Sequence, residues 1–108
     1  MKIVSYNINS SSQEKINKLF KMNADVYVVP EIACREQIEL HPDYEMKWNS
    51  FCTTKGLGVI WKKGKGIFLE NKYTDKLSYA IPIAYDDILI IGIWPTKKPD
   101  EKTNYTKI

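Results

Sequence analysis

The sequence is poor in the residues that build the commonest metal and redox sites. Its 108 residues include one histidine and two cysteines, which argues against a zinc site with closely spaced Cys and His ligands. Two cysteines are too few for a disulfide framework, so Cys34 and Cys52 are predicted to be free thiols. The longest apolar run, residues 88–94, is far shorter than the roughly 18 residues of a membrane span. Because no signal-peptide pattern opens the chain either, we expect a cytoplasmic protein without membrane contact.

Arginine is almost absent, although the chain is mildly basic. The net charge is +3, and fifteen lysines accompany the single Arg35. Arginine is the usual residue for forked recognition of phosphates and bases, so the charge permits an anionic partner without requiring one. Lysines in turns could face phosphate, but solubility charge is the simpler interpretation for them. A hydrophobic content of 44% and a charged content of 27% predict an ordinary globular domain, here one domain over residues 1–108.

The first thirty residues predict a strand, a helix and a second strand. Residues 2–8 are rich in β-branched and aromatic side chains and are typical of a buried strand. A capping-box pattern at Ser10 or Ser11 predicts the start of a helix that ends near Asn23. Residues 25–29 form the next apolar run, so the two strands should be parallel in a βαβ unit. The helix would pack through an apolar stripe of Ile16, Leu19 and Phe20.

The remainder of the chain alternates short apolar runs with turns. A lysine-rich hairpin turn is expected at residues 62–65, a tight turn at Asp86-Asp87, and the first turn of another helix at Thr103-Asn104. Together with the βαβ unit this order predicts an α/β domain with one mixed sheet of about six or seven strands. The further strands are expected at residues 45–49, 57–62, 66–70, 77–84 and 88–94.

Two polar residues follow apolar strands at the points where the strands end. Asn7 closes the first strand and Glu31 follows the second. Parallel neighbouring strands would bring both side chains to one edge of the sheet, where α/β sheets place ligands. A carboxylate and an amide oxygen suit Mg²⁺, which keeps several waters and needs few protein ligands. A plainer interpretation remains open, in which Asn7 terminates a strand and Glu31 is a helix N-terminal charge before Ile32-Ala33.

Four segments in order resemble the N-terminal half of the endonuclease/exonuclease/phosphatase superfamily, the DNase I-like fold. The first is the Tyr6-Asn7 pair that ends a strand, and the second is the Ala-Asp-apolar strand of residues 24–31, which runs into Glu31. The glycine-rich entry to a strand at residues 55–59 and the apolar strand of residues 88–94 complete the series. The resemblance covers essentially the whole chain but only the first half of the family's pattern.

The resemblance implies both a fold and an activity. The fold would be half of a four-layer α/β sandwich, and the activity would be divalent-metal-dependent hydrolysis of phosphate esters, with nucleic acid among the possible substrates. Asn7 and Glu31 would be ligands or near-ligands of Mg²⁺ or Mn²⁺, which would stabilise charge on the phosphate and the leaving oxygen. Among the lysines, Lys55 beside Gly56 is the one we favour for contact with a substrate phosphate.

Several positions depart from the family's pattern. Pro30 stands where the family often has Gln, and Trp94 stands where it commonly has His or Tyr; packing is the simpler role for this Trp, although it could stack on a base. The Asp-x-Asn motif and the Asp-His pair of the family's second half have no match, so no catalytic residue is assigned. The only histidine, His41, is expected in a solvated loop, and Asp86-Asp87 in a turn. The chain is therefore expected to be catalytically incomplete.

Two other classes of function stay open. The chain could be a non-catalytic fragment or interaction module, or a small nucleic-acid-binding domain suggested by its lysines. Its strands are apolar on both faces, which is typical of a sheet covered on both sides. We therefore expect a partner surface, provided by self-association or by a missing C-terminal half of the domain.

Overall fold

The computed structural model describes residues 1–8, 12–49, 56–69 and 80–94. No helix within these ranges is both long enough and apolar enough to cross a membrane. The elements follow in the order β1 (Ile3–Ser5), α1 (Gln13–Phe20), β2 (Val26–Ile32), η1 (Arg35–Gln37), β3 (Tyr44–Asn49), β4 (Gly56–Lys62), β5 (Gly66–Phe68), β6 (Ala80–Tyr85) and β7 (Ile88–Ile93).

The strands form two sheets instead of the single mixed sheet expected from the sequence. The first sheet has the order β1-β2-β4-β3, and the second has the order β5-β6-β7. In the first sheet β1 and β2 are parallel while β4 is antiparallel to both β2 and β3, and the second sheet is antiparallel throughout. The described part is thus mostly β with one short helix, although the number of strands agrees with the expectation.

The turn after β4 is where the chain changes sheets. We expected residues 62–65 to join two paired strands, but β4 and β5 belong to different sheets, so this prediction is wrong. Gly64 has a φ of 81° in the turn, a conformation that suits glycine. Gly66 then approaches Trp61 so closely that a Cβ atom would lie 2.5 Å from Trp61 Cδ1. A larger residue at position 66 would clash with Trp61 at the point where β5 leaves the first sheet for the second.

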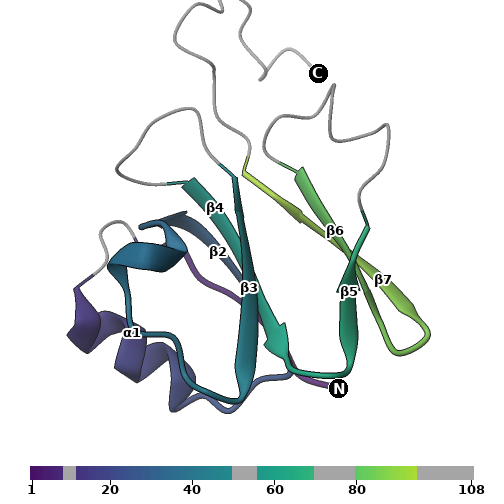
Figure 1. Cartoon of the computed structure of the whole chain (residues 1–108), viewed down its shortest axis with the longest axis horizontal. Coiled ribbons are helices and arrows are strands. Elements are labelled where there is room, and N and C mark those ends of the chain that lie inside the picture. Colours follow the sequence, from purple (N-terminus) through teal and green to yellow (C-terminus); the bar gives the residue numbers. More distant parts are fainter. Residues whose placement is uncertain (9–11, 50–55, 70–79, 95–108) are drawn as a thin grey trace, which may run out of the picture.

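Helix α1 covers one face of the first sheet and confirms the βαβ unit (Figure 1). Its N-cap is Ser12, whose hydroxyl accepts a hydrogen bond from the Lys15 amide at 3.2 Å, one or two residues later than predicted. Ile16 and Leu19 of the predicted stripe are buried, and Asn23 has the expected left-handed backbone with a φ of 52°. The first core lies between this helix and the sheet, with Ile16, Leu19, Tyr27, Val29 and Ile60 among its members.

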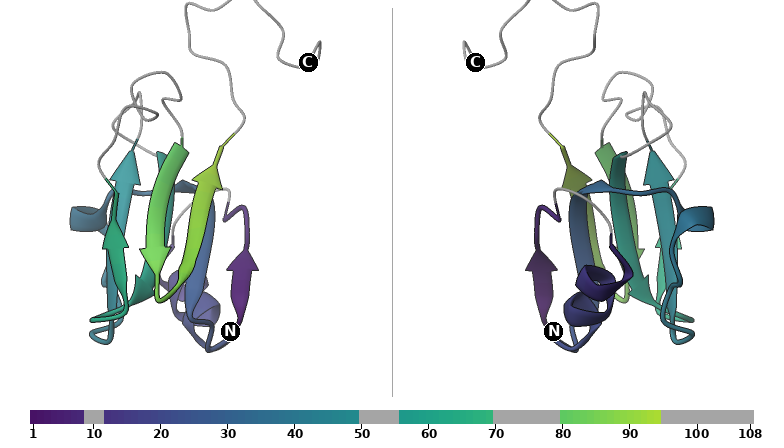
Figure 2. Two further views of the ribbon diagram at one scale, coloured as in Figure 1. Left: turned by 90° about the vertical axis from the view of Figure 1, so that its right-hand side faces the viewer. Right: turned by 90° about the vertical axis from the view of Figure 1, so that its left-hand side faces the viewer.

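A second core lies between the two sheets, which pack face to face (Figures 1 and 2). The layers therefore run helix, sheet, sheet. From the sequence we expected one face of the sheet to need cover from another half of the domain or from a second molecule. In the structure the second sheet of the same chain covers that face of the first sheet. The core is formed by Val26, Leu57, Val59 and Trp61 of the first sheet with Ile81, Ile83, Tyr85 and Ile90 of the second.

Strand β1 differs from its sequence-based description. Its apolar residues predict a buried strand, but β1 is an edge strand that pairs with β2, and the Ile3 side chain is 48% exposed. An edge position leaves one side of the strand open to solvent. The burial expected for the segment is reached only at Ile8, which is 1% exposed and joins the first core.

A polar cluster around Asp25 joins the two sheets at the end where β2 begins. The Asp25 carboxylate accepts hydrogen bonds from the Lys2 amide at 2.9 Å and the Tyr85 hydroxyl at 3.1 Å, and lies 3.6 Å from Lys62 Nζ. The Lys2 hydrogen bond is the largest cause that holds the pKa of Asp25 below its usual value, and Tyr85 and Lys62 add to it. Asp25 therefore stays charged and links residues from three separate segments.

Candidate functional site

The structure brings Asn7 and Glu31 together at one edge of the first sheet. The parallel pairing continues beyond the C-terminal end of β1. The Tyr6 amide donates a hydrogen bond to Val28 O at 3.0 Å, and the Ile8 amide donates one to Pro30 O at 3.3 Å. These hydrogen bonds keep the two chain segments side by side as far as Asn7 and Glu31. Asn7 Nδ2 donates a hydrogen bond to Glu31 Oε2 at 2.9 Å. The juxtaposition expected from parallel strand ends is present.

Glu31 has an unusual backbone for a residue in a strand. Its φ is 66°, and the pairing of β2 with β4 shifts at this point, with Pro30 opposite Leu57 and Ile32 opposite Gly56. Glu31 is the extra residue of this bulge. A left-handed conformation costs a non-glycine residue about 1–2 kcal/mol, and such strain concentrates at functional positions. The alternative role for Glu31, a charge at a helix start before Ile32, is wrong because β2 continues to Ile32.

Replacing Glu31 with glycine should therefore stabilise the fold relative to alanine at the same position. Both substitutions remove the carboxylate, but only glycine accepts a φ of 66° without a Cβ penalty. Part of the gain is offset because glycine also increases the entropy of the unfolded chain. We expect Glu31→Gly to unfold with a free energy about 1 kcal/mol higher than Glu31→Ala, measured by urea titration. Equal stabilities would show that the left-handed backbone is not maintained in solution.

The donor set at this edge is small. Within the described ranges, no group of three or more His, Cys, Asp or Glu side chains lies close enough to share a metal ion. The pair offers one carboxylate and one amide oxygen, with Glu31 half-buried and Asn7 exposed. These are hard oxygen donors, which suit Mg²⁺ or Mn²⁺ and leave most of the coordination to water and substrate oxygens. The residues present fit a weak, partial site for such an ion.

Two neighbouring side chains that sequence reasoning missed hold the backbone beside this pair. Lys15 of α1 donates from Nζ to Ile8 O at 3.4 Å, and Trp48 of β3 donates from Nε1 to Ile32 O at 2.9 Å. Lys15 lies in the first turn of a helix that follows Asn7 closely, so its position was accessible from the sequence. Trp48 was not, because its contact depends on the order of strands in the sheet. Lys55, favoured above for substrate phosphate, lies outside the described residues.

The other residues singled out in the sequence do not extend the site. Trp94 is half-buried and packs against the core between the sheets, which agrees with the packing role. Asp86 and Asp87 form the predicted turn between β6 and β7. His41 is exposed but not merely solvated, because its ring contacts Phe20 and Tyr44 with centroids 5.6 and 5.4 Å apart.

The cysteines are only partly described. Cys34 is a free, half-buried thiol, as predicted from the low cysteine content. Cys52 lies outside the described residues, and so does the predicted helix start at Thr103-Asn104.

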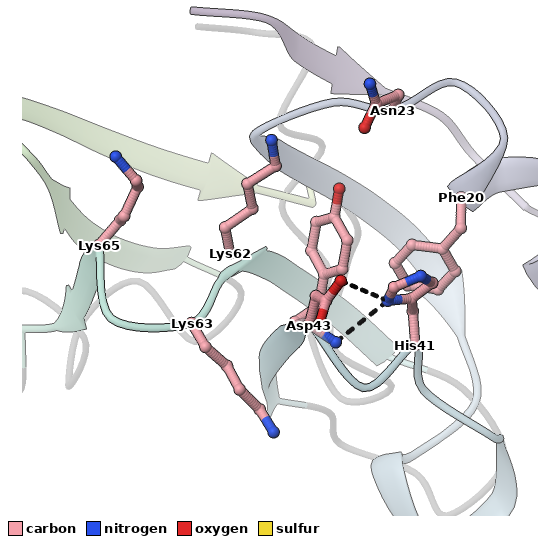
Figure 3. A pocket seen from close by; sticks show the side chains of 8 residues that line it. Phe20, Asn23, His41, Asp43, Lys62, Lys63 and Lys65 are labelled. Atoms are coloured by element: carbon pink, nitrogen blue, oxygen red, sulfur yellow. Dashed lines mark hydrogen bonds and ion pairs between the residues drawn. The ribbon is translucent and has the colours of Figure 1, made fainter.

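A lysine-lined pocket of about 490 Å³ lies at the opposite end of the first sheet (Figure 3). The antiparallel pairing of β4 with β2 places Lys62 beside Asp25, at the start of β2 rather than at its Glu31 end. The ammonium groups of Lys62, Lys63 and Lys65 point in different directions, and Lys62 lies 3.6 Å from the Asp25 carboxylate. Asp43 adds another carboxylate to the wall, so this pocket is not a concentrated anion site.

The resemblance to the endonuclease/exonuclease/phosphatase superfamily is supported by the motif residues alone, because comparisons with known proteins add no match. A scan against protein-family models finds no match, and a search of curated proteins finds no significant relative.

Proposed function

We propose that the edge of the sheet at Asn7 and Glu31 binds a divalent cation, as part of a metal-dependent phosphoester hydrolase site. The observation that carries this proposal is the 2.9 Å hydrogen bond between the two side chains, which come from the ends of neighbouring parallel strands. The left-handed backbone of Glu31 supports it, because the chain keeps a strained glutamate where glycine would be easier. The resemblance to the endonuclease/exonuclease/phosphatase superfamily supplies the reaction class.

Glu31 would be the principal ligand and Asn7 its positioning partner. The Asn7 amide nitrogen holds one carboxylate oxygen of Glu31, which fixes the orientation of the carboxylate at the edge of the sheet. Lys15 and Trp48 restrain the carbonyls of Ile8 and Ile32, one residue beyond each member of the pair. When bound, a divalent ion would stabilise negative charge on a phosphate ester and on its leaving oxygen.

The catalytic apparatus in this chain is incomplete. Within the described residues, no three His, Cys, Asp or Glu side chains gather at Glu31, so a full ligand set with a water-activating base is not assembled there. Residues 1–108 would therefore supply the metal-binding part of the site, and the layers helix, sheet, sheet would be part of the four-layer sandwich of this superfamily. We expect no metal-dependent cleavage of a phosphodiester such as bis(p-nitrophenyl) phosphate by this chain alone.

Titration with Mn²⁺ monitored by NMR tests the metal site directly, because the paramagnetic ion broadens nearby amide signals. We expect broadening centred on residues 7 and 31 at millimolar Mn²⁺, typical of sites with one carboxylate and many waters. Glu31→Gln, which keeps the size and the hydrogen-bond acceptor for Asn7, should weaken binding at least tenfold. Asn7→Asp, which adds a second carboxylate, should tighten binding by about tenfold.

The matched control is Glu45→Gln, which removes a carboxylate from an exposed position on β3. It should leave the Mn²⁺ response at residues 7 and 31 unchanged. The same broadening in Glu31→Gln as in the wild type would disprove the assignment of Glu31. Robust metal-dependent cleavage that Glu31→Gln abolishes would instead mean that the chain holds a complete site.

A further inference from the structure

The outer face of the second sheet, which points away from the first sheet, carries exposed apolar side chains on β5 and β7, while Ala80 and Pro82 of the central strand β6 are buried. Because side chains alternate along a strand, the residues of β7 that face away from the core between the sheets are Leu89, Ile91 and Ile93. Their side chains are 59%, 50% and 55% exposed, and Ile67 of β5 on the same face is 68% exposed. Pairing of the strands places Pro82 beside Ile91 and Ala84 between Leu89 and Ile67. We define this set as the outer apolar face.

The outer apolar face contains no charged side chain among the described residues of the three strands. Among the described residues that flank these strands, charged side chains lie in the turns at one end, at Lys65, Asp86 and Asp87. The outward positions of these strands are therefore apolar, whereas the solvated face of an antiparallel sheet usually carries polar residues. A surface of this kind carries no like charges that would repel an identical surface, even though the whole chain has a net charge of +3.

The area of the face approaches the apolar part of a standard protein interface. The exposed fractions of its four large side chains correspond to roughly 400 Å² of apolar surface, within the range of the largest patches of ordinary monomers. A standard interface buries about 800 Å² on each partner, of which about 65% is apolar in homodimers. Polar residues around the face would have to supply the remaining area of such an interface.

We infer that the outer apolar face is a homodimer interface, in which the second sheets of two copies pack face to face about a two-fold axis. A two-fold axis places the same patch on both partners, which requires a self-complementary surface. An uncharged sheet face meets this requirement, since two such sheets pack at about −30° with interdigitated side chains. The interface lies on a different layer from Asn7 and Glu31, so this inference does not depend on the metal site. It applies to the 108-residue chain by itself, because the fourth layer of the proposed sandwich would cover the same face.

Analytical ultracentrifugation of the 108-residue chain tests the inference. We expect a discrete species of two chains that dissociates on dilution between roughly 1 and 100 µM, as a standard interface of modest quality would. Ile91→Lys should raise the dissociation constant at least about 100-fold, because the two-fold axis buries one added ammonium from each copy. Circular dichroism should show the same fold in the variant, since the Ile91 side chain is half exposed in the monomer.

Ile3→Lys is the matched control. Ile3 is 48% exposed against 50% for Ile91, and it also lies on a strand, but β1 belongs to the first sheet. It should leave dimerisation unchanged. A monomer throughout the concentration range would overturn the inference. A dimer that survives Ile91→Lys, or assembly without a fixed size, would overturn it as well.

Discussion

Replacing Gly92 with alanine is expected to lower the free energy of unfolding by about 3 kcal/mol, the upper end of the range for overpacking a core. Gly92 of β7 is buried where the two sheets meet. A Cβ atom there would lie 2.6 Å from Val59 Cγ2 and 3.2 Å from Val28 Cγ1. Both contacts belong to β-branched residues with restricted rotamers, so the sheets themselves must move apart. Urea unfolding followed by tryptophan fluorescence measures the change.

A double-mutant cycle identifies the contact responsible. Val59→Ala alone should also destabilise the fold, by about 2 kcal/mol, because it leaves a cavity in the core between the sheets. In the double variant the methyl group added at Gly92 occupies part of the space vacated at Val59, so the cost should be clearly less than the sum. Additive effects would show that Gly92 and Val59 are not in contact, which would contradict the packing of the sheets.

The sequence predicted the elements of this fold far better than their assembly. The βαβ unit followed from local patterns, since the stripe from Ile16 to Phe20 and the apolar run before Pro30 each specify one element. The division into two sheets did not follow, because it depends on close approaches between residues of different strands. Gly66 against Trp61 and Gly92 against Val59 are examples, and each appears in the sequence only as a glycine.

The candidate site was predictable in its position but not in its geometry. Parallel strands placed Asn7 and Glu31 at one edge, and the pairing of their segments follows from the βαβ rule. The bulge that gives Glu31 a φ of 66° has no signal in the sequence, which shows neither glycine nor asparagine there. The sequence-based prediction also assigned the exposed apolar face to the wrong place, for a related reason. Apolar runs indicate that a sheet needs cover, but they do not indicate which face the same chain covers.

The free energy of unfolding should fall steeply between pH 10 and pH 12. Burial raises the pKa of Tyr44 and of Tyr85 to about 12, and the neighbouring Asp25 raises the pKa of Tyr85 further through its hydrogen bond and its charge. Unfolded tyrosine ionises near 10, so below that pH both states are neutral and the stability is fully present. As the pH rises toward 12 the unfolded chain loses protons first, which costs on the order of 2–3 kcal/mol for each phenol.

Tyr85→Phe separates this effect from the titration of lysines in the same range. At pH 8 the variant should be less stable than the wild type by about 1–2 kcal/mol, because Asp25 loses the hydrogen bond that the phenol donates at 3.1 Å. Toward pH 12 the difference should vanish or reverse, since phenylalanine has no proton to lose. Tyr6→Phe, which removes the hydroxyl of a side chain that is 42% exposed, is the control and should follow the wild-type curve.

A constant difference between Tyr85→Phe and the wild type from pH 8 to pH 12 would contradict this account. It would mean that the Tyr85 phenol is no harder to ionise in the folded protein than in the unfolded chain. That is incompatible with a side chain that is 1% exposed and whose hydroxyl faces a carboxylate. Ionisation would remove the only proton between the two oxygens and place two negative charges against each other, so the fold must resist it for as long as the two sheets stay packed.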